Sequence, residues 1–130
     1  MLERSYFAGT VTLGVNAAST YKGLGGLVGV AINKTKISQC FAAGEVVSLA
    51  VQKGGGLVGE PGDLLVDDYW DISRSKANNC APSLVVAGCT GTNASNAEPA
   101  HFFATSSPPL STWDFTTVWS ANPNDFPTLR

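Results

Sequence analysis

The chain has 130 residues, 14% of them charged, and a formal net charge of −2 at pH 7. This length suits one domain that buries a hydrophobic core. Its eight Lys and Arg residues form no basic run, which argues against a nucleic-acid partner. No apolar stretch reaches the ~18 residues that a membrane-spanning helix needs, so we expect no membrane insertion in this segment.

Patterns typical of β-strands begin near the N-terminus. Residues 5–14 alternate apolar and polar side chains around Val11, and residues 25–32 are continuously apolar, so both are predicted strands. A polar loop over 16–20 lies between them, and a turn over 33–36 follows. Because the repeat pattern is already present by Ser5, we expect the chain to be part of a longer protein. No signal peptide is visible at its N-terminus.

The same order of strand, loop and strand returns over residues 41–70. Residues 46–51 predict the next strand. Residues 66–70 fall 29 positions after residues 37–41, so Trp70 is expected to take the place of Phe41. No helical periodicity extends over ten residues in this part of the chain.

A five-residue phrase, Gly-Gly-Leu-Val-Gly, occurs twice, thirty positions apart. Repetition at this period is typical of solenoids. The glycines permit sharp corners and close approach of neighbouring segments, and the Leu and Val side chains are expected to fill the interior. The repeat residues are Gly25, Gly26, Leu27, Val28 and Gly29, and then Gly55, Gly56, Leu57, Val58 and Gly59.

The pattern changes after residue 71. Residues 72–112 are rich in Asn, Ser, Pro and Gly, and we expect a loop-rich insertion that lies over the repeats, with one candidate strand at 84–87. Residues 113–119 alternate large apolar and polar side chains, which predicts an amphipathic strand. We interpret residues 113–130 as a cap over the open end of the repeats.

Together these elements predict an all-β fold in one domain. A thirty-residue unit with three short strands can form one coil of a β-solenoid, and successive coils stack at the ~4.8 Å spacing of neighbouring strands. We expect about two to three coils in residues 1–71, followed by the insertion at 72–112 and the aromatic cap strand at 113–130.

Residues 25–46 carry the phrase, a polar turn and then Ile-Ser-Gln-Cys-Phe-Ala-Ala-Gly-Glu-Val. This pattern resembles the GLUG repeat of large bacterial surface proteins, with Phe41 in place of the usual tyrosine. The resemblance implies a right-handed parallel β-helix, export to the cell surface and an adhesive or structural role, and it brings no catalytic motif. It covers residues 5–71 and 110–130 and departs from the family pattern at 60–65 and 72–109.

Three cysteines leave at least one unpaired. Cys80 and Cys89 flank a short stretch and could close a small disulfide loop, while three reduced thiols are the alternative. Cys40 lies within the repeat and is expected to be a buried, apolar-like residue.

The densest acidic cluster comprises Asp63, Asp67, Asp68 and Asp71. On an alternating strand, Asp67 and Asp71 would share one face and Asp68 would lie on the other. Such oxygen ligands could hold Ca²⁺, and paired carboxylates could serve glycoside hydrolysis or lyase chemistry. The favoured interpretation is a solvated turn and strand edge, with no catalytic residue, metal or cofactor.

Two further motifs have structural interpretations. Residues 54–59 match a dinucleotide fingerprint, but no helix follows and the other copy has Leu24 at the first position. His101, the only histidine, cannot build a multi-histidine metal site and is expected to be a packed loop residue rather than the partner of a Cys40 nucleophile.

The candidate surface aromatics for stacking on sugars are Tyr69, Trp70, Trp113 and Trp119.

We therefore expect a non-enzymatic β-solenoid module of a secreted or cell-surface protein, acting in adhesion or as a structural scaffold, with self-assembly as a variant. Its partners would be a glycan, a host or matrix surface, or other copies of itself. The alternatives are a polysaccharide-active β-helix of the lyase or hydrolase kind and a Ca²⁺-stabilised carbohydrate-binding module.

Overall fold

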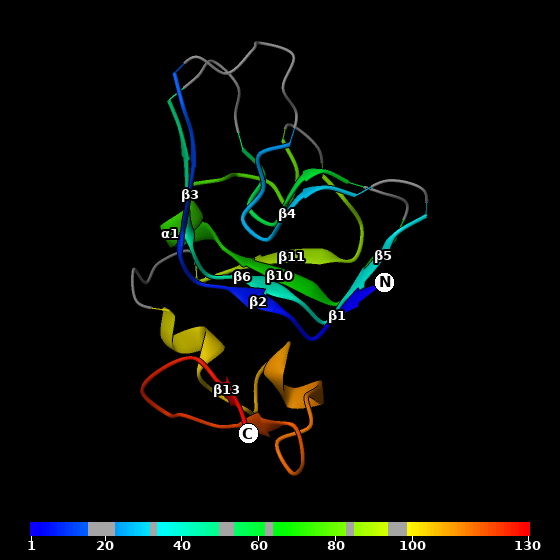
Figure 1. The fold of residues 1–130 in the computed structure, drawn as a ribbon, viewed down its shortest axis with the longest axis vertical. Helices are drawn as coiled ribbons and strands as arrows, with labels where there is room; N and C mark the ends of the chain where they lie inside the picture. The colour runs from blue at the N-terminus through cyan, green and yellow to red at the C-terminus, as the bar shows by residue number, and fades with distance from the viewer. Residues whose placement is uncertain (16–22, 32–33, 50–53, 62–63, 83–84, 94–98) are drawn as a thin grey trace.

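The computed structural model describes residues 1–15, 23–31, 34–49, 54–61, 64–82, 85–93 and 99–130. Within these residues, short strands predominate and helical turns are few (Figure 1). The described part of the chain is therefore all-β, as predicted. The predicted loop over 16–20, the candidate ligand Asp63, and parts of the segments predicted at 25–32, 33–36, 46–51 and 84–87 lie outside the described residues.

Most strands pair in parallel, in small sheets of two to four strands. The three-stranded sheet contains β1 (Leu2–Glu3), β5 (Lys36–Ser38) and β9 (Leu64–Val66), and the four-stranded sheet contains β2 (Tyr6–Phe7), β6 (Phe41–Ala42), β10 (Asp68–Asp71) and β11 (Cys89–Thr92). The parallel pairs are β3 (Thr10–Leu13) with β7 (Glu45–Ser48) and β4 (Val28–Val30) with β8 (Val58–Glu60). An antiparallel pair joins β12 (Trp119–Ser120) and β13 (Thr128–Leu129), and the helical elements are α1 (Ile72–Ser75) and two 3₁₀ turns (Pro99–Phe102 and Leu110–Thr112).

Each strand of the four-stranded sheet pairs with a strand that lies far along the chain. Tyr6 pairs with Phe41, and Phe41 pairs with Tyr69. Tyr69 in turn pairs with Thr90. The chain therefore returns to the same sheet repeatedly, and each excursion is shorter than the one before it.

A residue with positive φ stands at the same corner in four successive passes of the chain. Arg4 (φ 45°), Gln39 (φ 56°) and Asp67 (φ 53°) each join a strand of the three-stranded sheet to one of the four-stranded sheet, and Gly88 (φ 78°) precedes β11. The left-handed conformation costs a non-glycine residue roughly 1–2 kcal/mol. The amide groups of Arg4 and Gln39 offset part of this cost by donating to carbonyl oxygens of the next pass, at 3.2 and 2.9 Å.

The predicted alignment of Trp70 with Phe41 is wrong, and the position of this corner explains why. Tyr69 pairs with Phe41, and Trp70 pairs with Ala42. The true alignment is displaced by a single position from the predicted one, because the corner residues Gln39 and Asp67 must occupy equivalent positions.

The Gly-Gly-Leu-Val-Gly phrase lies where neighbouring segments approach most closely. Gly25 and Gly55 form a parallel bridge. A Cβ atom on Gly55 would lie 1.9 Å from the carbonyl oxygen of Val58, and one on Gly56 would lie 2.2 Å from the ring of Trp70. Backbone and indole thus occupy the space that any side chain would need.

The stack formed by the two copies of the phrase is extended by a third segment, which belongs to the predicted insertion. The amide groups of Leu27 and Val28 both donate to the carbonyl oxygen of Leu57, at 2.9 and 3.0 Å. The amide groups of Leu57 and Val58 both donate, in the same way, to the carbonyl oxygen of Cys80, at 3.0 Å each. Cys80 therefore takes the third position in this stack, and Leu57 and Val58 between the outer segments are completely buried.

The strand predicted at 84–87 is wrong for the residues that the structure describes. Val85 and Val86 belong to no strand, and β11 begins only at Cys89. β11 pairs in parallel with β10 and becomes the fourth strand of the largest sheet. Part of the predicted loop-rich insertion at 72–112 is thus an integral part of the sheet.

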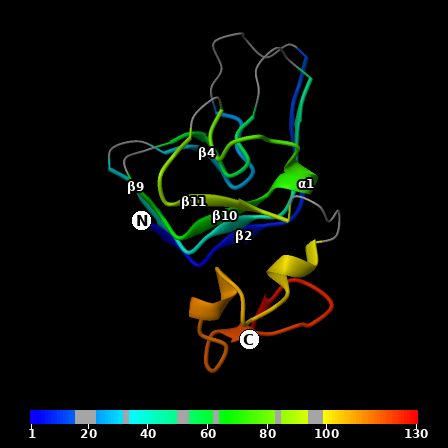
Figure 2. The same cartoon turned by 180° about the vertical axis from the view of Figure 1, so that it is seen from behind.

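Residues 99–130 cover the outer face of the four-stranded sheet (Figures 1 and 2). Phe41 stacks on Tyr6 and Phe102, with ring centroids 5.0 and 4.5 Å apart. The indole of Trp113 donates to the carbonyl oxygen of Gln39 at 3.0 Å. We expected this segment to cover the open end of the repeats, but it covers the face of the four-stranded sheet. The reason is that the aromatic side chains of Tyr6 and Phe41 project from that face and need burial.

The amphipathic strand predicted over 113–119 does not form. The Asp114 carboxylate accepts hydrogen bonds from the backbone amides of Thr116 and Thr117, at 2.8 and 2.9 Å, and from the Thr117 hydroxyl. These bonds hold the backbone in a turn, and the strand begins only at Trp119.

Candidate functional site

Asp68 is a buried structural carboxylate. One of its oxygens accepts a hydrogen bond from the amide of Cys40 at 2.9 Å, and the other accepts from the amide of Val66 at 3.1 Å. The bond from Cys40 joins two successive passes of the chain beside the left-handed corner, and the bond from Val66 is local to one pass. Burial raises the pKa of Asp68 to about 6, although the two amide hydrogen bonds act in the opposite direction.

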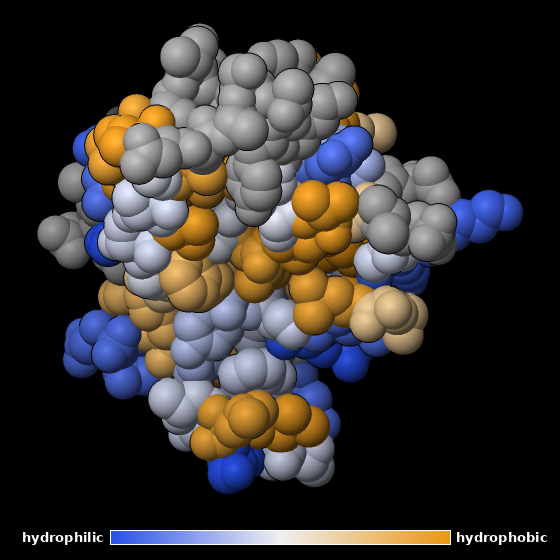
Figure 3. Space-filling model, turned by 45° about the horizontal axis from the view of Figure 1, so that its top comes forward, coloured by the Kyte–Doolittle hydropathy of each residue, from blue (hydrophilic) through white to orange (hydrophobic). Residues whose placement is uncertain are grey.

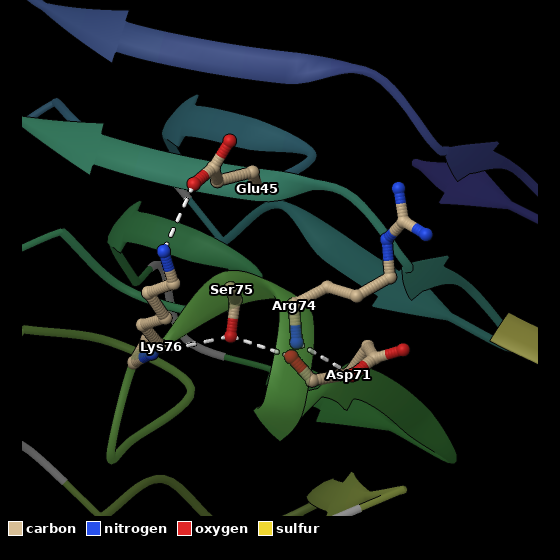
Figure 4. A network of polar contacts seen from close by, with 6 residues as sticks. Glu45, Asp71, Arg74, Ser75 and Lys76 are labelled. Atoms are coloured by element: carbon tan, nitrogen blue, oxygen red, sulfur yellow. Dashed lines mark hydrogen bonds and ion pairs between the residues drawn. The ribbon is translucent and has the colours of Figure 1, made fainter. Parts of the chain in front are cut away.

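Asp71 is also completely buried, and it caps α1. Its Oδ1 accepts from the backbone amide of Arg74 and its Oδ2 from the side-chain amide of Asn93, both at 2.9 Å. The Asp71 carbonyl oxygen accepts from the Ser75 hydroxyl at 2.6 Å (Figure 4). Both carboxylate oxygens therefore have structural partners.

The structure does not assemble the predicted acidic cluster into one site. Asp67 lies at the corner, exposed, and β10 begins only at Asp68, so Asp67 and Asp71 do not form the predicted face of a strand. The prediction of a solvated edge is wrong for Asp68 and Asp71, which are buried. Across the described residues, no three His, Cys, Asp or Glu side chains group in a way that could hold a metal ion.

Cys80 and Cys89 form a disulfide, with their Cα atoms 6.2 Å apart. The bond joins the third position of the glycine-phrase stack to the first residue of β11. Cys40 is a free thiol, fully buried, as the sequence indicated. Burial raises the pKa of Cys40 to about 11, so at neutral pH the thiol is protonated and a poor nucleophile.

His101 does not activate Cys40. The Cys40 thiol donates to the carbonyl oxygens of Ser38, at 3.2 Å, and Leu2, at 3.8 Å. The His101 ring packs edge-on against Phe102, with centroids 5.0 Å apart, in accord with the packed loop residue that we predicted.

The four candidate surface aromatics divide into two pairs. Trp70 and Trp113 are 7% and 6% exposed, so for them a surface role is wrong. The Trp70 indole donates to the carbonyl oxygen of Ala77 at 3.2 Å, which places this ring in the core. Tyr69 and Trp119 are half-buried, and only this pair keeps substantial surface for contact with a ligand.

A cleft of about 300 Å³ opens between β7 and the segment after α1. Sequence reasoning missed it because its walls come from three separate stretches of the chain. The only advance signal was the polar run Asn78-Asn79, which we interpreted as loop. Its lining residues are Val46, Ser48, Gly54, Ser75, Lys76, Ala77, Asn78, Asn79 and Ala81.

Lys76 shapes this cleft. It ends α1 in the left-handed conformation (φ 56°), and its amide donates to the carbonyl oxygen of Ile72 at 3.1 Å. Its ammonium forms an ion pair with Glu45 of β7 at 3.2 Å, so the pair spans from helix to strand (Figure 4). The Ser75 hydroxyl accepts from the amide of Ala77 at 3.2 Å and fixes the backbone that enters the cleft wall.

The surface outside the cleft carries scattered hydrophobic side chains. Val85 is 94% exposed, Leu49 58% and Val30 48%. Figure 3 shows hydrophobic residues in the middle of the face that it presents and also near its upper left and its bottom, with polar and charged residues between them. Isolated exposed apolar residues are normal on protein surfaces and do not by themselves define a site.

No family model matches the chain, and neither a curated protein nor a solved structure gives a significant match. None of the helices in the described ranges has the length and apolar character that crossing a lipid bilayer requires.

Proposed function

We propose that the chain is a non-enzymatic β-helical module of a secreted or cell-surface protein, of the kind that the GLUG resemblance suggests. Its role would be adhesion or structural support, with a stack of parallel strands that holds loops and clefts for contact with a partner. The alignment of four left-handed corner residues in successive passes carries this proposal, because a wound chain that turns at the same point in each coil produces such a column.

The proposed architecture is a right-handed parallel β-helix of two coils and a shortened third. β1 to β4 would form the first coil, β5 to β8 the second, and β9, β10 and residues 72–82 the third. The corner at Gly88 and β11 would begin one further pass. The parallel registers support this winding. The right-handed sense is supported by the strong general preference of parallel strand connections for that hand.

A non-enzymatic role is supported by the way in which reactive groups are used. Asp68 and Asp71 bond to backbone and amide groups, and the Cys40 thiol is buried and protonated. The Cys80–Cys89 disulfide supports an extracellular or cell-surface location, because disulfides persist in oxidising compartments.

The test combines binding with turnover. The purified protein would be screened on a glycan array, on immobilised matrix proteins and for self-association, and incubated with a panel of neutral and acidic polysaccharides. We expect binding to at least one surface and no new reducing ends or unsaturated products. Product formation that is lost in Asp67→Ala, the exposed carboxylate of the cluster, would overturn the proposal, as would the absence of any binding.

The second candidate is a carbohydrate-binding module, and the cleft beside α1 favours it. The lining combines hydroxyl and amide groups with small apolar side chains, a mixture that suits sugars. Stabilisation by Ca²⁺ belongs to this candidate. A melting temperature that falls in EDTA and recovers with excess Ca²⁺ would support a calcium-dependent form, and an unchanged melting temperature would reject it.

A further inference from the structure

The cleft exists because the third pass of the chain does not extend the β3-β7 sheet. Where a third strand would pair with β7, the chain forms α1, which packs against β7. Lys76 then ends the helix and turns the backbone away from the sheet. The space left between β7 and residues 77–81 is the cleft of about 300 Å³.

The floor and the rim of the cleft differ in chemistry. Val46, Gly54, Ala77 and Ala81 give apolar surface with short side chains, so a flat ligand can approach the backbone closely. Asn78 is exposed, and its side chain makes no hydrogen bond to any other described residue, which leaves two donors and an acceptor for a ligand.

Among the described residues, the charged groups beside the cleft are Lys76 and Glu45, and they balance each other. The Lys76 ammonium lies 3.2 Å from the Glu45 carboxylate, so the two charges largely neutralise each other at the edge of the cleft. The pair still offers donor and acceptor atoms, but it gives little net attraction for an anion. This balance favours a neutral ligand with several hydroxyl groups over a phosphate, sulfate or uronate.

We propose that this cleft binds one or two units of a neutral saccharide. The C–H face of the sugar ring lies on the small apolar residues, and its hydroxyl groups bond to the Asn78 amide and to the Lys76–Glu45 pair. A volume of about 300 Å³ is at the small end of ligand sites, which limits the occupant to a short segment of glycan. The inference rests on the proposed binding role and assigns it to a particular site.

The experiment is a titration of the ¹⁵N-labelled full chain, followed by amide chemical shifts. The probes are glucose, galactose, mannose, N-acetylglucosamine and their disaccharides, with galacturonic acid as the charged comparison. We expect at least one neutral sugar to shift the amides of residues 75–81 and 46–48 with saturation. Asn78→Ala should weaken that binding about fivefold, the equivalent of one net hydrogen bond.

Two further variants make the result specific. Asn78→Trp fills the cleft from an exposed position and should abolish binding, whereas Asn124→Ala removes an exposed amide from a distant turn and should leave it unchanged. The site would be refuted if no probe shifts the cleft amides, or if galacturonic acid binds more tightly than every neutral sugar. Saturable shifts confined to Tyr69 and Trp119 would also refute the cleft, while leaving the proposed adhesive function in place.

Discussion

Replacing Gly56 by alanine tests the proposed reason for the glycine-rich phrase. The added Cβ atom would lie 2.2 Å from Cδ1 of Trp70, far inside contact distance. The indole has little freedom to move, because Trp70 is only 7% exposed and its ring nitrogen donates to the carbonyl oxygen of Ala77. Overpacking of a tight core costs about 1–3 kcal/mol, and we expect Gly56→Ala at the upper end, about 3 kcal/mol.

The measurement is urea-induced unfolding at constant pH with the disulfide intact, monitored by tryptophan fluorescence and by circular dichroism. Gly14→Ala is the matched control, since its added Cβ atom would have no heavy atom within 4 Å. The control should change the free energy of unfolding by less than about 1 kcal/mol. Agreement between the two probes would justify the two-state treatment.

A double-mutant cycle with Trp70→Leu assigns the effect to the contact itself. The smaller side chain leaves room for the new methyl group, so Gly56→Ala should cost at least about 1 kcal/mol less in the Trp70→Leu background than alone. Our explanation of the phrase fails if Gly56→Ala costs under about 0.5 kcal/mol, or if the cost is the same in both backgrounds.

Three other variants test the buried polar groups and the disulfide. The pKa of Asp68 is about 6 in the folded state, above its unfolded value of about 3.9. The stability that the protonated side chain contributes is therefore complete below about pH 4 and is lost as pH rises through about 6. The free energy of unfolding of wild type minus that of Asp68→Asn should fall as pH rises over that range, and a difference that rises would contradict the burial argument. Asp71→Ala removes the cap of α1 and the buried carboxylate that accepts from the Asn93 amide, so we expect a loss of about 2–4 kcal/mol in urea unfolding. The exposed Asp67→Ala should cost under about 1 kcal/mol, and equal effects would refute the structural role of Asp71. Replacing Cys80 and Cys89 by alanine opens a loop with a sequence separation of 9, which by chain entropy costs about 2.5 kcal/mol, and an unchanged urea midpoint of the double variant would show that the bond does not form in solution.

The sequence predicted the class of fold because its signals are local. Alternating and continuously apolar stretches are typical of strands, and the Gly-Gly-Leu-Val-Gly phrase indicated stacked segments. Gly25 and Gly55 do lie side by side in the structure. Repetition is a strong signal because equivalent residues in a parallel stack face the same neighbours.

The alignment within the stack was harder to predict, because it depends on backbone conformation. Gln39 and Asp67 share no side-chain chemistry, yet both adopt positive φ at the same corner. Aspartate adopts this conformation more readily than most residues but glutamine does not, so the two positions carry no shared signal that would align them. The predicted position of Trp70 was wrong by a single position for this reason.

The third pass was missed because it lacks the phrase. Cys80 supplies the carbonyl oxygen that corresponds to that of Leu57, and a backbone contact of this kind leaves no repeated side-chain pattern in the sequence. The cleft depends on this same pass and on the helix that Asp71 caps. Its residues become neighbours only when three distant segments meet, which explains why the candidate site could not be predicted.

The stretches of chain between β2, β6, β10 and β11 become successively shorter, so the two ends of the four-stranded sheet differ in structure. Strands β1, β2, β3 and β4 all lie at the same edge of their sheets, whereas on the opposite side α1 lies beside β7 and the disulfide-linked segment beside β8. Among the described residues, β1 to β4 therefore have no strand partner on their outer side, whereas β7 and β8 are flanked by α1 and by the segment that contains Cys80. On the proposed β-helical winding, a strand fused before residue 1 would find a pairing edge at β1 to β4, which makes that end the one to extend in protein engineering.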